Sequence, residues 1–472
     1  MSDEDSIMRL VSAVYVLPCP MVNQPMKTSF AASFDTATKD HPNSVTLMRS
    51  SDTARRKLAD ALEQVRSVAN VPGSKHQNVL NLAKDYVPKI HRILFSCKVQ
   101  PEMAVLNKKL EFQWISGMEN NKHVKKDDAL MYELAISIAT CSLASAGAAS
   151  EEAVAGRFPA AAKLFNAAAG AQTCLHEDLL PQWITLGSET EVSQLPSEVA
   201  GPVAEAFRGL YLAHAQQMAV ATALTKGASP ANYSLLAKLC RGLKEEMQGF
   251  VEAMRSHAAA QYSKMNPSLT VFITFQMGIY ESMMHYFWAR LMWSKDKYGL
   301  AIAILHKAAA WAETRKYASA AVGIPDPADR SSPVKAVEKD ILDYRGHLRS
   351  LLDEWEKDNR TVYFDSVPNS VKEEDLVTKG VVIKKPEAFV LESPEPVQLG
   401  PKARAEMRAP PPQVLPRFNS GSGLPPGFIT PAPVALPPED DLPPPVYAPQ
   451  QLQRTDSDLA REMQAKFDMH GQ

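Results

Sequence analysis

Apolar residues recur every three or four positions over much of the chain, which is the spacing of one face of an α-helix. Between residues 127 and 149, for example, Leu130, Leu134, Ile138 and Cys141 follow this spacing. The stretch is too long for a strand. It therefore predicts an amphipathic helix.

Similar stretches, rich in Ala, Leu, Met, Glu, Lys and Gln, predict further helices. They span residues 51–69, 76–97, 151–177, 200–226, 230–263, 267–295, 297–319 and 334–359. Pro159 falls inside one of them and should delay its start or kink it. Only residues 11–17 and 110–115 look like strands. We therefore expect a mainly α-helical body with a small β-sheet, in which alanine-rich helices pack in close pairs.

The composition changes near residue 386. Of the 35 prolines, 18 lie in residues 386–450, and the segment from 386 onward has a net charge of −4. A segment of this kind buries too little apolar surface to offset its ordering entropy. The sequence predicts a helical body over residues 8–385, a disordered proline-rich tail over 386–454, and a short amphipathic helix over 455–468.

The chemistry of the chain favours a binding protein over an enzyme. The five cysteines are widely spaced with no Cys-x-x-Cys pair, which favours free thiols over disulfides or a zinc site. The eleven histidines show no metal-ligand spacing, and no phosphate-loop, Gly-x-Ser-x-Gly or kinase motif occurs. We expect no catalysis, metal or cofactor. The net charge of −2 gives no reason to expect nucleic acid as a partner.

The sequence also bears on location. No run of about 18 apolar residues, the length needed to span a bilayer, is evident. The first residues are acidic, whereas a secretory signal begins with basic ones. We expect a cytoplasmic protein without a transmembrane segment.

The tail contains two candidate interaction motifs. Pro444, Pro445 and Tyr447 form a Pro-Pro-x-Tyr sequence, a polyproline II ligand of WW domains; the alternative is a chance match in a proline-rich segment.

Further on, the predicted helix 455–468 gathers apolar residues on one side. Its Leu459, Ala460, Met463 and Gln464 resemble the core of single-helix ubiquitin-binding motifs. The alternative is an amphipathic end that has another partner or none.

Five patterns in the helical body, in order, resemble the BRO domain of Alix-type endosomal sorting proteins. They are Phe165-Asn-Ala-Ala-Ala-Gly170, Leu212-Ala-His-Ala-Gln-Gln217, Leu235-Leu-Ala-Lys-Leu239, Tyr298-Gly-Leu-Ala-Ile-Ala-Ile-Leu305 and Lys357-Asp-Asn-Arg-Thr-Val-Tyr-Phe-Asp-Ser-Val-Pro368. No long helical V-shaped region follows, so the chain is most similar to the short members of that family. The resemblance implies a boomerang-shaped helical domain with a tetratricopeptide-like core and a small sheet.

The resemblance also implies a partner and a groove. In the family, the concave face binds the carboxy-terminal amphipathic helix of an ESCRT-III subunit, and two apolar residues reach into it. Carried over by position, these are Leu235 and Leu239, whose spacing of four puts them on one helix face. The alternative is that two leucines at this spacing belong to the core. The family's groove aromatic and nearby lysine fall on Ala219 and Thr222, so we expect a shallower and less basic groove, and a further groove leucine falls on Val382. The resemblance further implies an adaptor without known catalysis.

Two functions remain open. The first is an ESCRT-associated adaptor, recruited to endosomes through its partners, whose tail binds a WW-domain ubiquitin ligase of the HECT type and also ubiquitin. The second is a scaffold of the ambient-pH signalling type that recruits a protease or a kinase.

Overall fold

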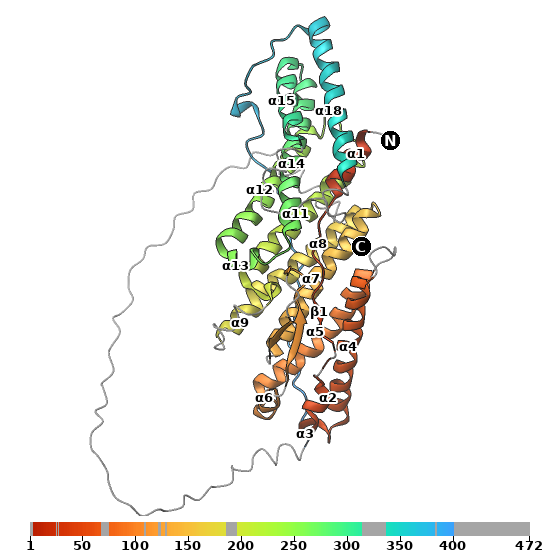
Figure 1. Cartoon of the computed structure of the whole chain (residues 1–472), viewed down its shortest axis with the longest axis vertical. Coiled ribbons are helices and arrows are strands. Elements are labelled where there is room, and N and C mark those ends of the chain that lie inside the picture. The colour runs from red at the N-terminus through yellow and green to blue at the C-terminus, as the bar shows by residue number, and fades with distance from the viewer. Residues whose placement is uncertain are drawn as a thin grey trace, which may run out of the picture.

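Two central helices, α7 (Leu130–Val154) and α8 (Phe158–Thr173), lie in the middle of an elongated, mainly helical body (Figure 1). The computed structural model describes residues 3–24, 26, 28–67, 75–107, 110–120, 124–127, 130–185, 196–313, 337–382 and 385–400. In Figure 1, α15 and α18 lie towards one end of the body, and α2, α3 and α6 lie towards the other.

The helices before and after this centre follow the predicted order. Those before it are α1 (Asp3–Ser12), α2 (Phe30–Ser33), α3 (Asp35–Thr38), α4 (Pro42–Ser67), α5 (Lys75–Val99) and α6 (Pro101–Asn107). Those after it are η1 (Cys174–Leu179), α9 (Leu180–Thr185), η2 (Ser197–Val199), α11 (Gly201–Leu224), α12 (Tyr233–His257), α13 (Ala259–Tyr262), α14 (Pro267–Trp293), α15 (Tyr298–Trp311), α18 (Glu338–Asp358), η3 (Asn359–Tyr363) and η4 (Glu373–Asp375).

A small antiparallel sheet accompanies the helices. Its strands, in spatial order, are β1 (Met21–Val22), β2 (Phe112–Ile115) and β3 (Val124–Asp127). The β1–β2 register places Met21 opposite Ile115. In β2, Phe112 and Trp114 are buried and alternate with less buried residues, which is the pattern of a strand with one face on the core.

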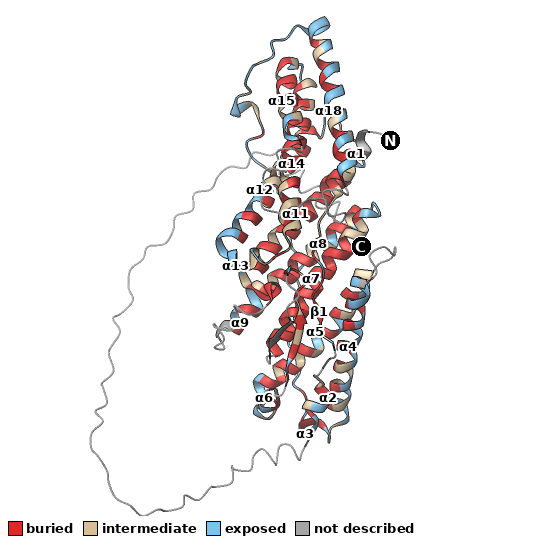
Figure 2. Ribbon diagram, in the orientation of Figure 1, coloured by how far each residue is buried: buried red, intermediate tan, exposed pale blue. Residues whose placement is uncertain are grey.

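Helix α7 is the core of the body. All its residues from Leu130 to Ala149 are buried, as Figure 2 shows. Its many Ala, Ser and Gly residues allow α5 and α8 to pack closely against it. By length and composition alone α7 could cross a bilayer, which the sequence analysis did not anticipate, but its most apolar stretch is entirely buried inside the protein. Protein therefore surrounds this helix.

The boundary between α7 and α8 follows from two residues, Gly156 and Pro159. Gly156 has a φ of 75°, a left-handed conformation that glycine adopts without strain and that commonly ends a helix. Pro159 lies in the first turn of α8, where its missing N–H costs no helical hydrogen bond. The predicted helix 151–177 is therefore divided, and Pro159 helps to begin the second part.

The predicted strand at residues 11–17 is wrong. Its first residues end α1, and the following chain is extended without a strand partner. The Nε2 groups of Gln217 and Gln276 each donate a hydrogen bond to the carbonyl of Ala13, at 2.5 Å. Side chains of α11 and α14 thus satisfy a backbone group that a neighbouring strand would otherwise have bound.

After η4 the chain runs back along the body in extended conformation over residues 376–382 and 385–400, which we call the strap. Its backbone is bound by distant residues: Val397 N–H donates to Ser96 Oγ at 2.8 Å, and Gly400 N–H donates to the carbonyl of Ala37 at 3.0 Å. Val397 and Leu399 are buried. The packed body therefore extends to Gly400, beyond the boundary predicted at residue 385, because these side chains and hydrogen bonds secure residues that have no regular secondary structure.

Candidate partner-binding surface

The strap is fastened to α12 near the middle of that helix. The N–H of Val381 donates to the carbonyl of Lys238 at 3.0 Å. The side-chain amide of Gln216, on α11, donates to the carbonyls of Val381 and Leu239, at 2.9 and 3.1 Å. Gln216 therefore joins α11, α12 and the strap.

Glycines in two helices allow the strap to lie directly against them. A Cβ atom at Gly242, in α12, would lie 2.3 Å from the carbonyl oxygen of Val381. At Gly170, in α8, it would lie even closer to the carbonyl of Glu387. Both positions require glycine because the strap backbone occupies the space of a side chain. Gly242 was not among the residues predicted to have a role. The sequence feature that could have indicated it is an isolated glycine inside a helical pattern.

The five groove residues predicted from sequence differ in accessibility. Leu239 is 0% exposed and Leu235 is 8% exposed, because α12 packs against α11 and α14 and both leucines belong to the core. Ala219 is also buried, whereas Thr222 is partly exposed. Val382, in the strap, is 43% exposed. Leu239 thus cannot touch a partner while this packing persists. The more accessible of the five are Thr222 and Val382, and the polar side of α12 is accessible as well.

That polar side carries positive charges that are partly compensated. Arg241 Nε lies 2.6 Å from Glu245 Oε1, one turn further along α12. Lys244 Nζ lies 2.8 Å from Glu281 Oε2 on α14. Lys244 also lies over the ring of Trp311, 5.8 Å from its centre, a distance at which cation–π attraction operates.

A cleft of about 530 Å³ opens beside this surface, between α12, α14, α15 and the start of the strap. Met284, Trp311 and Leu376 give it apolar walls. Charged side chains of both signs also line it: Arg241, Lys307, Glu281 and Glu373. Burial lowers the pKa of His285, which also lines the cleft, so its imidazole is neutral at pH 7. The cleft can accept an apolar side chain next to a charged or polar group.

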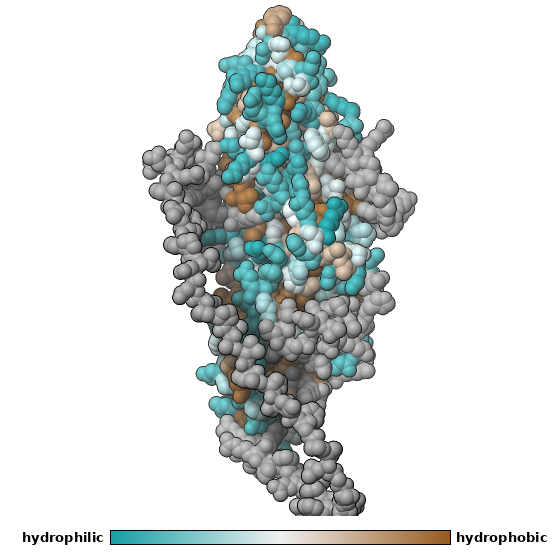
Figure 3. Space-filling model, turned by 90° about the vertical axis from the view of Figure 1, so that its left-hand side faces the viewer, coloured by the Kyte–Doolittle hydropathy of each residue, from teal (hydrophilic) through white to brown (hydrophobic). Residues whose placement is uncertain are grey.

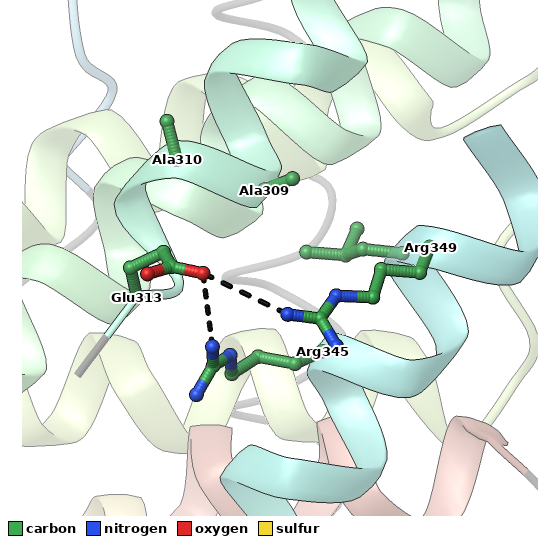
Figure 4. Close-up of a pocket in the computed structure, with 6 residues that line it drawn as sticks. Ala309, Ala310, Glu313, Arg345 and Arg349 are labelled. Carbon is green, nitrogen blue, oxygen red and sulfur yellow. Dashed lines mark hydrogen bonds and ion pairs between the residues drawn. The ribbon is translucent and has the colours of Figure 1, made fainter.

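A second, smaller pocket of about 320 Å³ lies between α15 and α18 (Figure 4). Arg345 and Arg349 both approach the carboxylate of Glu313, at 2.9 and 3.8 Å, as the dashed lines mark. Two guanidinium groups share one carboxylate, so the pocket retains positive charge. No residue predicted from sequence lies here.

The described residues offer little for catalysis. All five cysteines are buried free thiols, and burial raises the pKa of Cys19, Cys97, Cys141 and Cys174 to about 12. Such thiols stay protonated near neutral pH and are poor nucleophiles. Within the described ranges, no cluster of three or more His, Cys, Asp or Glu side chains could hold a metal ion.

The predicted tail motifs lie outside the described residues. These are the WW-binding sequence with Pro444, Pro445 and Tyr447, and the helix with Leu459, Ala460, Met463 and Gln464.

The chain matches the model of the BRO1-like domain over residues 21–404. A search of curated proteins gave no match. Among solved structures, one described as the structural basis for endosomal targeting by the Bro1 domain is similar with a TM-score of 0.54 and 16% identity, covering 80% of this chain and 93% of that one.

Two further similar structures contain ALIX. A complex of the ALIX BRO1 domain with CHMP4C gives a TM-score of 0.57 at 16% identity and covers 83% of this chain and 98% of that one. ALIX bound to the SIVmac239 PYKEVTEDL late domain gives 0.59 at 14% identity, covering 80% of this chain and 49% of that one. At these identities the structures establish the fold, and they confirm the predicted mainly helical class with a small sheet. With the family match over most of its length, the chain belongs to the BRO1-like domain family.

Proposed function

We propose that this protein is a non-catalytic adaptor that binds the carboxy-terminal amphipathic helix of an ESCRT-III subunit along α12, in endosomal sorting. The observation that carries the proposal is the family match over residues 21–404, together with the similarity in fold to a BRO1 domain solved in complex with CHMP4C. The cleft beside α12 supports it, because apolar walls next to charged side chains of both signs suit an amphipathic helix.

The burial of the two leucines changes which residues should contact the partner. We assign direct contact to Thr222, Lys238 and Val382, which keep accessible surface, and to the exposed edge of Leu235. Leu239 and Ala219 would shape the groove from beneath. In a shallow groove of this kind, charged side chains and the strap contribute more to recognition of the partner than they would in a deep apolar groove.

The test is a fluorescence anisotropy titration of the full chain with labelled carboxy-terminal helices from ESCRT-III subunits. Val382→Asp combined with Lys238→Glu should weaken binding at least tenfold, because one change removes an apolar contact and the other reverses a charge. A matched control, Val390→Asp with Lys57→Glu, makes the same exchanges at exposed positions elsewhere and should bind normally. Leu239→Asp is unsuitable because it would bury a charge and unfold the domain.

Equal binding by the two double variants would reject this groove. Absence of binding by the folded wild-type chain would reject the ESCRT-III assignment and favour the signalling scaffold, whose test is co-purification of a protease or a kinase.

We further propose that the tail recruits the ubiquitin system, in the cytoplasm and at endosomes that the protein reaches through its partners. The Pro-Pro-x-Tyr sequence ending at Tyr447 supports a WW-domain ubiquitin ligase of the HECT type, and the sequence pattern of Leu459, Ala460, Met463 and Gln464 supports ubiquitin. Tyr447→Ala should abolish capture by isolated WW domains, and Ala460→Arg should abolish capture by immobilised ubiquitin. Each variant is the control for the other.

A further inference from the structure

Exposed apolar side chains gather at the α18 end of the body, in residues 362–367, which we call the apical loop. Phe364 is 74% and Val362 is 62% exposed, and Tyr363 and Val367 are also exposed. These are four of the eleven large exposed hydrophobic residues in the described part of the chain. Figure 3 shows apolar colour at the upper tip of the molecule, bordered by hydrophilic side chains.

The apical loop is held in a defined and unfavourable backbone conformation. Phe364 has a φ of 57°, and Asp296, in the neighbouring turn between α14 and α15, has a φ of 60°; they are the two non-glycine residues with positive φ in the described ranges. A bulky residue rarely adopts this conformation, because it costs about 1–3 kcal/mol. Strain of this kind concentrates at functional sites.

Hydrogen bonds maintain this conformation. The side-chain amide of Asn359 donates to the carbonyl of Asp365 at 2.9 Å, and the N–H of Asp365 donates to Asn359 Oδ1 at 2.9 Å. The Asp365 carboxylate in turn accepts from the N–H of Gly299 at 2.8 Å, at the start of α15. The loop is therefore anchored on both sides of Phe364.

An aromatic stack supports the base of the loop. The ring of Tyr363 stacks on that of Tyr298, with centroids 3.6 Å apart, and meets the edge of Trp293 at 5.7 Å. Trp293 stacks in turn on Trp355, at 4.2 Å. The loop thus presents Val362 and Phe364 from a rigid platform.

Side chains of both charges surround the loop, and they include Asp358, a half-buried carboxylate directly before η3. Three carboxylates are engaged by neighbouring groups of the body: Asp296 accepts from the Tyr298 hydroxyl, Asp365 from Gly299, and Glu356 from His306. Four cations are exposed, and the ion pairs between described residues include none of them. They are Lys295, Lys297, Lys357 and Arg360. Lysine and arginine side chains can extend past an apolar group to reach a charged surface.

We propose that the apical loop is a membrane contact, in which Val362 and Phe364 enter an anionic phospholipid bilayer and the four cations meet its headgroups. A bilayer suits this surface better than a protein does, because a stable protein interface needs about 800 Å² per partner and this tip is narrow. Apolar insertion combined with attraction to anionic lipid is the usual basis of peripheral membrane binding. This proposal is independent of the ESCRT-III groove.

Flotation of the full chain with vesicles tests it. The wild type should float with vesicles of phosphatidylcholine plus phosphatidylserine, less with phosphatidylcholine alone, and less in high salt, which screens the headgroups. Val362→Ser with Phe364→Ser should reduce the floating fraction at least tenfold. The matched control, Val105→Ser with Val154→Ser, changes two valines that are exposed elsewhere and should float as the wild type does.

Two further variants separate the causes. Phe364→Gly relieves the positive-φ strain, so it should fold at least as well as the wild type and still float poorly. Lys295→Glu with Lys297→Glu should remove the preference for phosphatidylserine. Failure of the wild type to float, or equal flotation of the Val362 and Phe364 double variant, would overturn the proposal. Binding of ESCRT-III helices in solution should be unchanged in all these variants, so the two proposals can fail separately.

Discussion

Arg55 and Glu133 form an ion pair inside the body, with the guanidinium Nε 2.7 Å from the carboxylate Oε1 and both side chains buried. The same carboxylate accepts hydrogen bonds from the Tyr86 hydroxyl and the Trp114 indole N–H, each at 2.7 Å. Glu133 therefore connects α4, α5, α7 and β2. Its buried carboxylate has one ion-pair partner and accepts two further hydrogen bonds.

Replacing Glu133 should destabilise the protein strongly. Glu133→Leu leaves the Arg55 guanidinium buried without its partner, which typically costs about 3–5 kcal/mol. Urea unfolding measures the loss. Glu152→Leu breaks the exposed pair with Arg157, which solvent screens, and should cost far less. Similar losses in the two variants would mean that the buried network does not stabilise the fold.

Substitution of two glycines in α12 should have opposite effects. Gly242→Ala places a methyl group against the carbonyl of Val381 and should detach that part of the strap, which raises hydrogen exchange at Val381. Gly249→Ala has open space around its new methyl group and should stabilise the helix by about 0.5–1 kcal/mol. Thermal unfolding with hydrogen exchange distinguishes the two. An unchanged strap in Gly242→Ala would contradict the close contact.

The stability of the protein should fall in weak acid partly because of His214. Burial lowers the pKa of this side chain to about 4, from the ordinary 6.5. The folded state keeps it neutral while the unfolded state takes up a proton, so the free energy of unfolding decreases as the pH falls from about 6.5 to about 4. The full effect is about 3 kcal/mol.

The measurement is urea unfolding at several pH values. His214→Gln should flatten the pH dependence across this window, whereas His257→Gln, at an exposed position, should leave it unchanged. A wild-type slope that persists in His214→Gln would assign the acid sensitivity to other groups.

The cysteines should be unreactive in the native protein. All five are buried, and the raised pKa of these thiols leaves little thiolate at pH 8. Labelling with a thiol-specific disulfide reagent should be slow in buffer and should reach five thiols per chain in denaturant. Fast labelling of one thiol in buffer would show that its part of the body opens locally.

The sequence predicted the long helices well because their signals are local. Helix α14 begins where expected: Pro267 occupies its first turn, and the side chain of Asn266 caps it by accepting from the N–H of Ser268. Such signals depend on neighbours in the chain. The family resemblance was likewise confirmed.

The strap and the groove could not be predicted in the same way. The strap has no period, and its hydrogen bonds reach residues such as Ser96 and Ala37, roughly 300 positions or more away in sequence. The spacing of Leu235 and Leu239 correctly placed both on one side of a helix. It could not reveal that this side faces the core, because burial depends on how α11 and α14 pack against α12.

The strap also determines how the body responds to mechanical force. Its attachments to Ala37, Ser96, Asn166 and Lys238 follow one another along the chain, from Gly400 back to Val381. A force on the tail acts first on the attachment nearest to it. The attachments should therefore break one after another, beginning at Gly400. Tension on the tail is thus taken up by successive detachment, and the attachment at Lys238 of α12 is the last of the four to break.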